Sequence, residues 1–198
     1  MEFRETVRRR RMVRSYEPDR PVPREVVDEL LSLGVRAPSA GHTQGWRFLV
    51  LDDITSREAF WTACSDGPAD EWLTRMQSAP VLIVVFSDRD AYLDRYAEPD
   101  KGWTDRDESH WPIPYWHVDA GMASMIMLLG AVDEGLAACF FGVPGERWPA
   151  VRSAFAVPDG LTPVGVISLG YPAPDRRSPS LRRGRRPWED VVAYGSFA

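Results

Sequence analysis

Residues 80–87, Pro-Val-Leu-Ile-Val-Val-Phe-Ser, limit the possible folds more than any other part of this sequence. Every position from 81 to 86 is apolar, so both faces of a strand formed here would be apolar. A strand of this kind is buried by other elements on both of its faces. The sequence therefore predicts a buried central strand.

Further strands are predicted at residues 46–51, 138–141 and 163–171. Apolar spacing, together with proline and glycine at segment ends, predicts helices at residues 2–12, 23–35, 55–64, 69–78, 117–134, 144–155 and 188–194. Helices and strands are mixed without a regular βαβ alternation, so the predicted class is α+β. The length of 198 residues fits a single domain over residues 1–198.

Residues 88–116 differ from the rest of the chain. They are rich in charged residues, Trp and Pro, and their apolar residues show no sustained helical or strand spacing. A loop this long in a compact domain is usually functional or mobile. We expect this inserted segment to form a lid or wall over an active site, where Trp103, Trp111 and Trp116 limit the shape of the substrate. The competing interpretation is that its aromatic side chains only pack a dimer interface.

Composition restricts the class of protein. The net charge of −5 argues against a general nucleic-acid binder, which usually has a basic domain. Cys64 and Cys139 form neither a disulfide framework nor a metal-binding motif, so no metal site is expected. No apolar signal-peptide core follows the N-terminus, and the apolar stretch at 122–132 is too short to span a bilayer. We therefore expect a soluble cytoplasmic protein without a membrane partner.

Arginine is concentrated at the two ends of the chain. Of the 24 Lys and Arg residues, six arginines lie at positions 4–14 and six at positions 176–186. Two clusters this far apart suggest that both ends converge on one anion, because the planar guanidinium suits phosphate. The alternatives are a solvated basic helix face for the first cluster and a nucleic-acid module for the whole protein.

Two N-terminal segments are similar to segments of the nitroreductase family. The pattern Arg-Arg-x-x-Arg at 10–14, followed by an aromatic residue, resembles the family's Arg-Arg-Ser-x-Arg-x-Phe, with Met12 in place of Ser. Residues 37–48, Ala-Pro-Ser-Ala-Gly-His-Thr-Gln-Gly-Trp-Arg-Phe, resemble the family's Ala-Pro-Ser-x-x-Asn-x-Gln-Pro-Trp-x-Phe. Here His42 replaces the usual Asn and Gly45 the usual Pro.

Two later segments extend the resemblance. Residues 136–142, Leu-Ala-Ala-Cys-Phe-Phe-Gly, match the family's strand and glycine beside the isoalloxazine ring of FMN, although Phe140 and Phe141 also suit a plain core. Residues 182–192 resemble the family's C-terminal basic segment, which binds the FMN phosphate. The order and spacing of all four segments make the resemblance more specific than any one of them does.

The resemblance implies a nitroreductase-like fold, in which helices flank a central, mostly antiparallel sheet and two copies form an intertwined homodimer. It also implies FMN as cofactor. In relatives, the segment corresponding to 37–48 reaches the flavin of the partner subunit. The cofactor-binding residues that the resemblance implies are Arg10, Arg11, Met12, Arg14, Pro38, Ser39, Ala40, His42, Gln44, Phe140, Gly142, Arg183, Arg185 and Arg186.

The implied activity is an FMN-dependent, ping-pong oxidoreductase reaction. NAD(P)H reduces FMN and leaves, and a small electron-poor compound such as a nitroaromatic or quinone is then reduced. Flavin N5 carries this chemistry, so no catalytic side chain is required, although His42 is a candidate acid or base. No Gly-x-Gly-x-x-Gly follows a strand, which argues against a separate Rossmann site for the nicotinamide cofactor.

Two other functions remain open on the sequence. One is a specialised member of the same fold, such as a desaturase, a reductive dehalogenase or a flavin-destroying enzyme, which the Trp-rich segment favours. The other is a flavin-binding protein without turnover.

Overall fold

The computed structural model describes residues 1–65, 68–176 and 178–197. Within them, one antiparallel sheet contains β1 (Trp46–Leu51), β2 (Val81–Asp88), β3 (Ala137–Phe141) and β4 (Leu161–Gly170) in the order β1-β2-β4-β3. The predicted α+β class and antiparallel sheet are therefore confirmed, and each predicted strand lies within two residues of its observed position.

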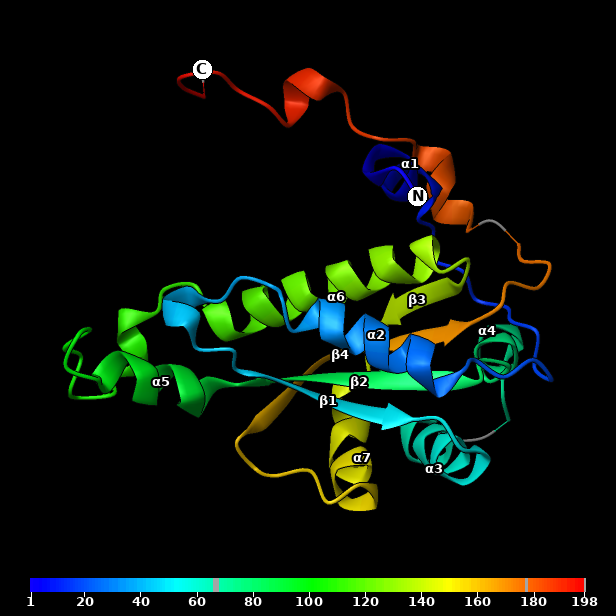
Figure 1. Ribbon diagram of the computed structural model, residues 1–198, viewed down its shortest axis with the longest axis horizontal. Coiled ribbons are helices and arrows are strands. Elements are labelled where there is room, and N and C mark those ends of the chain that lie inside the picture. The colour runs from blue at the N-terminus through cyan, green and yellow to red at the C-terminus, as the bar shows by residue number, and fades with distance from the viewer. Residues whose placement is uncertain (66–67, 177, 198) are drawn as a thin grey trace.

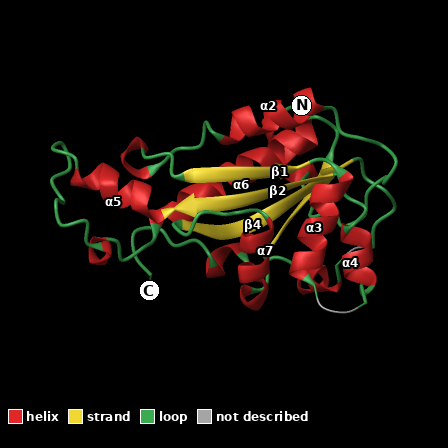
Figure 2. Ribbon diagram, turned by 90° about the horizontal axis from the view of Figure 1, so that it is seen from below, coloured by secondary structure: helices red, strands yellow, loops and turns green. Residues whose placement is uncertain are grey.

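Strand β2 organises two hydrophobic layers, as its apolar sequence predicts. Val81, Ile83 and Val85 face the core under α2 (Arg24–Gly34) and α6 (Tyr115–Asp133). The alternating side chains of Leu82, Val84 and Phe86 face the core under α3 (Ile54–Cys64), α4 (Glu71–Met76) and α7 (Trp148–Ala154). The sheet thus lies between two helical layers, with α2 and α6 above it and α3 and α7 below it in Figure 1, and Figure 2 shows the strands side by side from below.

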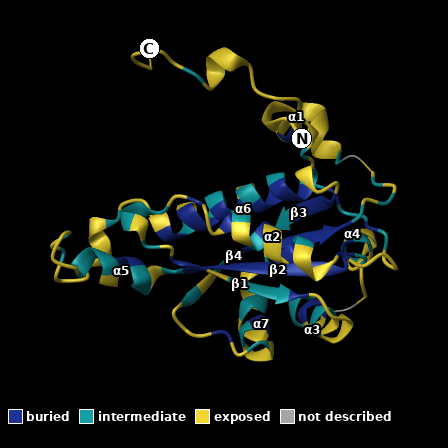
Figure 3. Ribbon diagram, in the orientation of Figure 1, coloured by how far each residue is buried: buried dark blue, intermediate teal, exposed yellow. Residues whose placement is uncertain are grey.

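The two ends of the chain lie outside these layers. Helix α1 (Phe3–Arg9) lies near the C-terminal end of α6, and the last residues run out from the domain through the short 3-10 turns η4 (Pro179–Arg183) and η5 (Trp188–Asp190) (Figure 1). Most of α1 and of the C-terminal arm, which we define as residues 184–197, is exposed (Figure 3). These segments therefore bury little of their own apolar surface.

Several predicted elements differ from the observed ones. Residues 88–116 are not one irregular loop, because α5 (Arg89–Ala97) begins them and is capped by the Asp88 side chain, which accepts from the Ala91 amide. The first helix ends at Arg9 rather than at residue 12, so the arginine motif follows it as extended chain. The predicted final helix is only the turn η5. Residues 144–155 divide into the 3-10 turn η3 (Gly145–Arg147) and α7.

Tyr16 connects the N-terminal segment to the sheet, and its ionisation makes the free energy of unfolding depend on pH in the alkaline range. It is buried, and its hydroxyl lies 2.6 Å from the Val13 carbonyl oxygen and 2.7 Å from Ser168 Oγ. Burial raises its pKa above the ordinary value of 10.0, although the Ser168 hydrogen bond opposes the shift. The hydroxyl therefore ionises in the unfolded chain before it does in the folded one, and its contribution to stability is present below pH 10 and lost above it.

We expect Tyr16→Phe to remove this part of the pH dependence. Above pH 10 the free energy of unfolding should fall less steeply in the variant than in the wild type, by about 1.4 kcal/mol per pH unit. Urea unfolding at about pH 8 and pH 11 measures the difference between the two slopes. Equal slopes would contradict the assignment.

Candidate functional site

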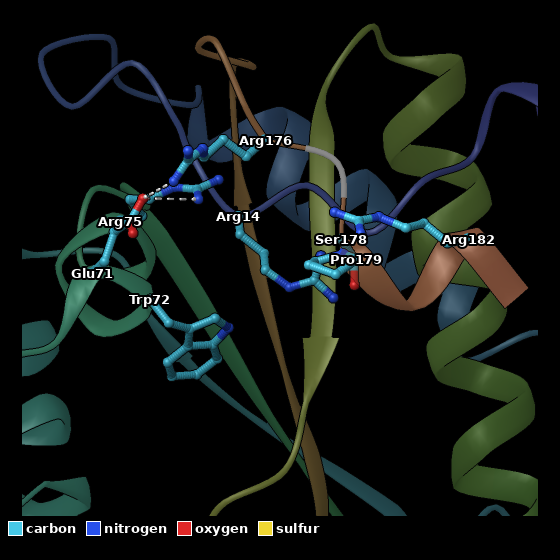
Figure 4. A pocket seen from close by; sticks show the side chains of 8 residues that line it. All are labelled: Arg14, Glu71, Trp72, Arg75, Arg176, Ser178, Pro179 and Arg182. Carbon is cyan, nitrogen blue, oxygen red and sulfur yellow. Dashed lines mark hydrogen bonds and ion pairs between the residues drawn. The ribbon is translucent and has the colours of Figure 1, made fainter.

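An arginine-lined cavity of about 640 Å³ lies where the two ends of the chain meet α4. Figure 4 shows side chains from α4, from the N-terminal segment and from the region around η4 converging on it. Three members of the arginine clusters that the sequence singled out, Arg14 from one end and Arg176 and Arg182 from the other, therefore share one cavity. Its lining residues are Arg14, Glu71, Trp72, Arg75, Arg176, Ser178, Pro179 and Arg182.

Ion pairs hold part of this lining in place. Arg75 pairs with Asp175, whose Oδ2 also accepts from the Arg14 backbone N–H at 3.0 Å. Glu71 Oε1 lies 3.2 Å from Arg176 Nη1 and 3.9 Å from Arg75 Nη1. Four arginines and one glutamate line the cavity, so its lining carries excess positive charge suited to an anion.

The guanidinium of Arg14 is oriented by its own segment. Its Nη1 donates to the Met12 carbonyl oxygen at 3.1 Å, and the side chain points into the cavity (Figure 4). Met12 itself forms a parallel bridge with Ala138, and its sulfur accepts from the Phe140 N–H at 3.3 Å. Met12 therefore has a structural contact at the edge of β3, at the position where the family pattern has Ser.

Arg10 and Arg11 differ in their surroundings. Arg11 is exposed, whereas Arg10 is half-buried and its Nη1 has no hydrogen-bond partner among the described residues. A buried donor without a partner is rare in folded proteins and calls for an explanation such as a bound group. Arg10 therefore has spare hydrogen-bonding capacity for a ligand.

The two phenylalanines at the end of β3 lie on opposite faces of the sheet. The Phe140 ring fills the space beside Gly165, where a Cβ would lie 2.3 Å from it, so this side chain is part of the core. Phe141 lies on the other face, stacked on Trp61 with ring centroids 5.6 Å apart and edge-on to Trp72 at 5.8 Å. Of the two, only Phe141 presents its ring towards α4.

Gly142 follows Phe141 in open space. No atom of the described residues lies within 4 Å of the position that a Cβ would occupy there, so a planar group can approach the backbone. Gly142 lines a second cavity of about 390 Å³, which shares Trp72 with the arginine-lined cavity. The two cavities are therefore neighbours, with the side chain of Trp72 common to both.

Residues 39–45, which we call the loop 39–45, form the third part of the predicted site. They contain the turn η1 (Ala40–His42), and Ser39 Oγ accepts from the Gln44 N–H at 2.9 Å. His42 and Gln44 are exposed and have positive φ angles of 56° and 55°. His is one of the non-glycine residues enriched in this conformation, together with Asn, which explains how it can replace the family's Asn.

The loop 39–45 and the arginine-lined cavity lie at opposite ends of the protomer. The loop is bound to Asp119 near the start of α6, whereas Met1, just before α1, is bound to Asp133 at its end. These two positions are about 21 Å apart along the helix. Figure 1 shows the loop next to α5 at one end of the sheet and the N-terminal segment near α4 at the other. The predicted site residues therefore do not form one site within a single chain.

The C-terminal arginines are placed differently from the prediction. Arg183, Arg185 and Arg186 are exposed and do not line the cavity, and Arg186 pairs with Asp190 at 3.9 Å. The lining instead includes residues that the predicted set omitted. Trp72 and Arg75 could have been recognised from their i, i+3 spacing on a short helix. Arg176 and Arg182 belong to the C-terminal arginine cluster, but no motif marks Glu71, Ser178 and Pro179.

The described part of the chain offers neither a metal site nor a membrane span. Among the described residues, no group of three or more His, Cys, Asp or Glu side chains could hold a metal ion. No membrane-spanning helix is found in residues 1–65, 68–176 and 178–197, because each helix there is too short or too polar.

Comparison with known proteins adds independent evidence. The sequence model of the nitroreductase family matches residues 7–171. An NADH dehydrogenase/NAD(P)H nitroreductase, so named, of Methanothermobacter thermautotrophicus is 32% identical over 87% of this chain and 78% of its own length. An iodotyrosine deiodinase of Nematostella vectensis is 21% identical over 96% of this chain and 74% of its own length.

A solved structure supports the same relationship. A nitroreductase from Desulfovibrio desulfuricans, determined in complex with FMN, superposes with a TM-score of 0.73 at 26% identity. The superposition covers 100% of this chain and 99% of the other.

Proposed function

Because this chain belongs to the nitroreductase family, we propose that it is an FMN-dependent oxidoreductase that uses NAD(P)H to reduce small electron-poor compounds. The observation that carries the proposal is the arginine-lined cavity, where Arg14 from one end of the chain meets Arg176 and Arg182 from the other. The FMN bound to a related structure and the NAD(P)H in a relative's name support the choice of cofactor and donor.

The residues present fit what FMN requires of a protein. Its phosphate dianion needs cations, which Arg176 and Arg182 supply, and Arg10 has a buried donor without a partner among the described residues. Its isoalloxazine needs an apolar wall and a close backbone approach, for which Trp72 and Gly142 are suited. When bound, FMN accepts hydride from the donor and passes reducing equivalents to the oxidant.

The side chains then have distinct roles in the proposal. Arg14 would face the pyrimidine edge of the flavin, where its positive charge would favour negative charge on that side of the ring. Arg176 and Arg182 would bind the phosphate, and Arg183, Arg185 and Arg186 would join them if the arginine-rich C-terminal region folds back on assembly. No side chain has to supply a proton, although His42 is exposed at the tip of its loop and can do so.

We propose that the active form is a homodimer in which the loop 39–45, including Ser39, Ala40, His42 and Gln44, completes the partner's flavin site. The separation of this loop from Arg14 within one chain supports the proposal. A partly exposed apolar stripe on α6 suits an interface, which should bury well over about 2,000 Å². The stripe consists of Val118, Met122, Met125 and Leu129.

The C-terminal arm also suits an interface. It carries large apolar side chains that are more than half exposed, and such patches mark interaction sites. These are Trp188, Val191, Tyr194 and Phe197.

The substrate class is the next part of the proposal. We favour nitroaromatics or quinones, since the relative from Methanothermobacter is named a nitroreductase. A dehalogenase-like specialisation is the alternative that the likeness to an iodotyrosine deiodinase supports. Steady-state oxidation of NAD(P)H with menadione, a nitroaromatic and a halophenol in parallel separates these activities. Flavin binding without turnover on any of them would indicate a storage protein.

The cavity predicts selectivity for FMN over riboflavin. Wild-type protein should bind FMN at least about 100-fold more tightly, because two charge-assisted phosphate contacts each contribute roughly 1.5–3 kcal/mol. Arg182→Gln should lose most of this selectivity and leave riboflavin binding unchanged. Fluorescence titration of apoprotein with each flavin measures the ratio.

Arg20→Gln is the matched control, because Arg20 lies over the Tyr171 ring, outside the cavity lining. It should retain the wild-type ratio. Equal affinity of the wild type for FMN and riboflavin would refute the phosphate assignment.

A further inference from the structure

Asp119 is a buried acidic residue on α6 for which the proposed reaction has no use. Its side chain is 1% exposed, and its Oδ2 accepts from the Ala40 backbone N–H at 2.8 Å and from the Tyr92 hydroxyl at 2.7 Å. Burial raises the pKa of Tyr92 and Asp119 raises it further, so the hydroxyl stays protonated and donates. One carboxyl oxygen thus joins α5, α6 and the loop 39–45.

The backbone of the loop 39–45 needs such support. His42 and Gln44 are both left-handed without being glycine. Conformations of this kind are strained, and they persist only where the surrounding structure determines them. Hydrogen bonds from outside the loop are therefore required to keep it in this shape.

Helix α5 also packs directly against the loop. A Cβ on Gly45 would lie 2.4 Å from Tyr92 Cε2, and one on Gly41 would lie 2.8 Å from Tyr96 Cε2. Arg95 Nε donates to the Gly41 carbonyl oxygen at 2.9 Å. The Tyr92 ring occupies the space beside Gly45, so this chain has no room for the proline that the family usually has there.

The Trp-rich segment supports α5 in turn. The Trp111 ring lies 4.6 Å from the Tyr96 ring and 5.8 Å from the Tyr92 ring, and Trp103 lies 4.8 Å from Tyr96. The aromatic residues of 88–116 therefore back the two tyrosines that contact the loop.

We propose that Asp119 and Tyr92 are positioning residues that fix the shape in which the loop 39–45 is presented to a flavin. The inference rests on the proposed function, in which this loop completes the site of the partner. The inserted segment 88–116 then serves as a brace, which means that it supports the loop from outside. Its helix α5 carries the three side chains that do so, Tyr92, Tyr96 and Arg95.

Tyr92→Phe tests the proposal, because it keeps the ring beside Gly45 and removes only the hydroxyl that donates to Asp119. In the apoprotein, hydrogen exchange of the amides at residues 39–45 should become about tenfold faster. In the flavin titration, the Kd for FMN should rise about tenfold. Asp119→Asn, which keeps the volume of the side chain, should produce the same two changes and serves if Tyr92→Phe fails to fold.

Ser124→Ala is the matched control, since Ser124 is buried on the same helix and its Oγ donates to the Ala120 carbonyl oxygen within that helix. This variant should leave both the amide hydrogen exchange at residues 39–45 and the Kd for FMN unchanged. Exchange that is unaltered at 39–45, or accelerated equally throughout α5 and α6, would overturn the proposal. If the wild type binds no FMN, the proposed function fails, and the exchange measurement still decides whether Asp119 and Tyr92 fix the loop.

Discussion

Replacing Met125 by arginine is expected to convert the protein into a monomer that no longer holds FMN. Met125 is 44% exposed in a single chain, so the charge costs an isolated protomer little. In the proposed dimer the same guanidinium would be buried without a partner, which costs several kcal/mol. Sedimentation should show the loss of the dimer, and the Kd for FMN should rise by at least about 100-fold.

Ile54→Arg is the control for this prediction. Ile54 is 65% exposed, but it begins α3 on the opposite side of the sheet from α6. The variant should remain a dimer with wild-type affinity for FMN. A Met125→Arg protein that stays dimeric and retains its flavin would place the interface elsewhere.

Trp116→Ala is expected to destabilise the protein by about 3–5 kcal/mol, the usual cost of truncating a large buried side chain. Trp116 is 4% exposed, and its ring lies 6.2 Å from that of Tyr92 and 6.1 Å from that of Trp111. Loss of the indole ring would leave a cavity beside Tyr92, which supports the loop 39–45. Chemical unfolding measures the change in the free energy of unfolding.

Ile113→Ala, at an exposed position of the same segment, is expected to change stability by no more than about 0.5 kcal/mol. The prediction that residues 88–116 act as a lid has a different signature. If these residues act as a lid, Trp116→Ala should change the ratio of activities on nitroaromatic and quinone oxidants. That change, expressed as a free energy, should exceed the change in the free energy of unfolding. Measuring both quantities on one variant separates a lid from a brace.

Most of the fold could be predicted from the sequence because the signals are local. The alternation of β2 between two layers follows from six consecutive apolar residues, and α2 from its apolar spacing. Helix α5 was missed because its buried residues, Tyr92 and Leu93, are adjacent and give no helical period. Its start is set by the Asp88 cap, which is a weaker signal than periodicity.

The site was harder to predict because it is assembled by tertiary contacts. Arg14 follows from a motif, but Arg75 enters the cavity only because its helix meets the two chain ends there. The sequence also could not separate Phe140 from Phe141. That distinction depends on Gly165, which lies on the neighbouring strand β4, two residues from Ile167, the partner of Phe140, and leaves space for the Phe140 ring.

Defects at the two ends of the protomer should complement each other genetically. Each flavin site of the proposed dimer takes Arg14 from one chain and the loop 39–45 from the other. A chain altered at Arg14 and a chain altered at Asp119 would each have two impaired flavin sites as a homodimer. When co-expressed they would form heterodimers in which one of the two sites is assembled entirely from unaltered parts, whereas two alleles altered at the same end would not rescue each other.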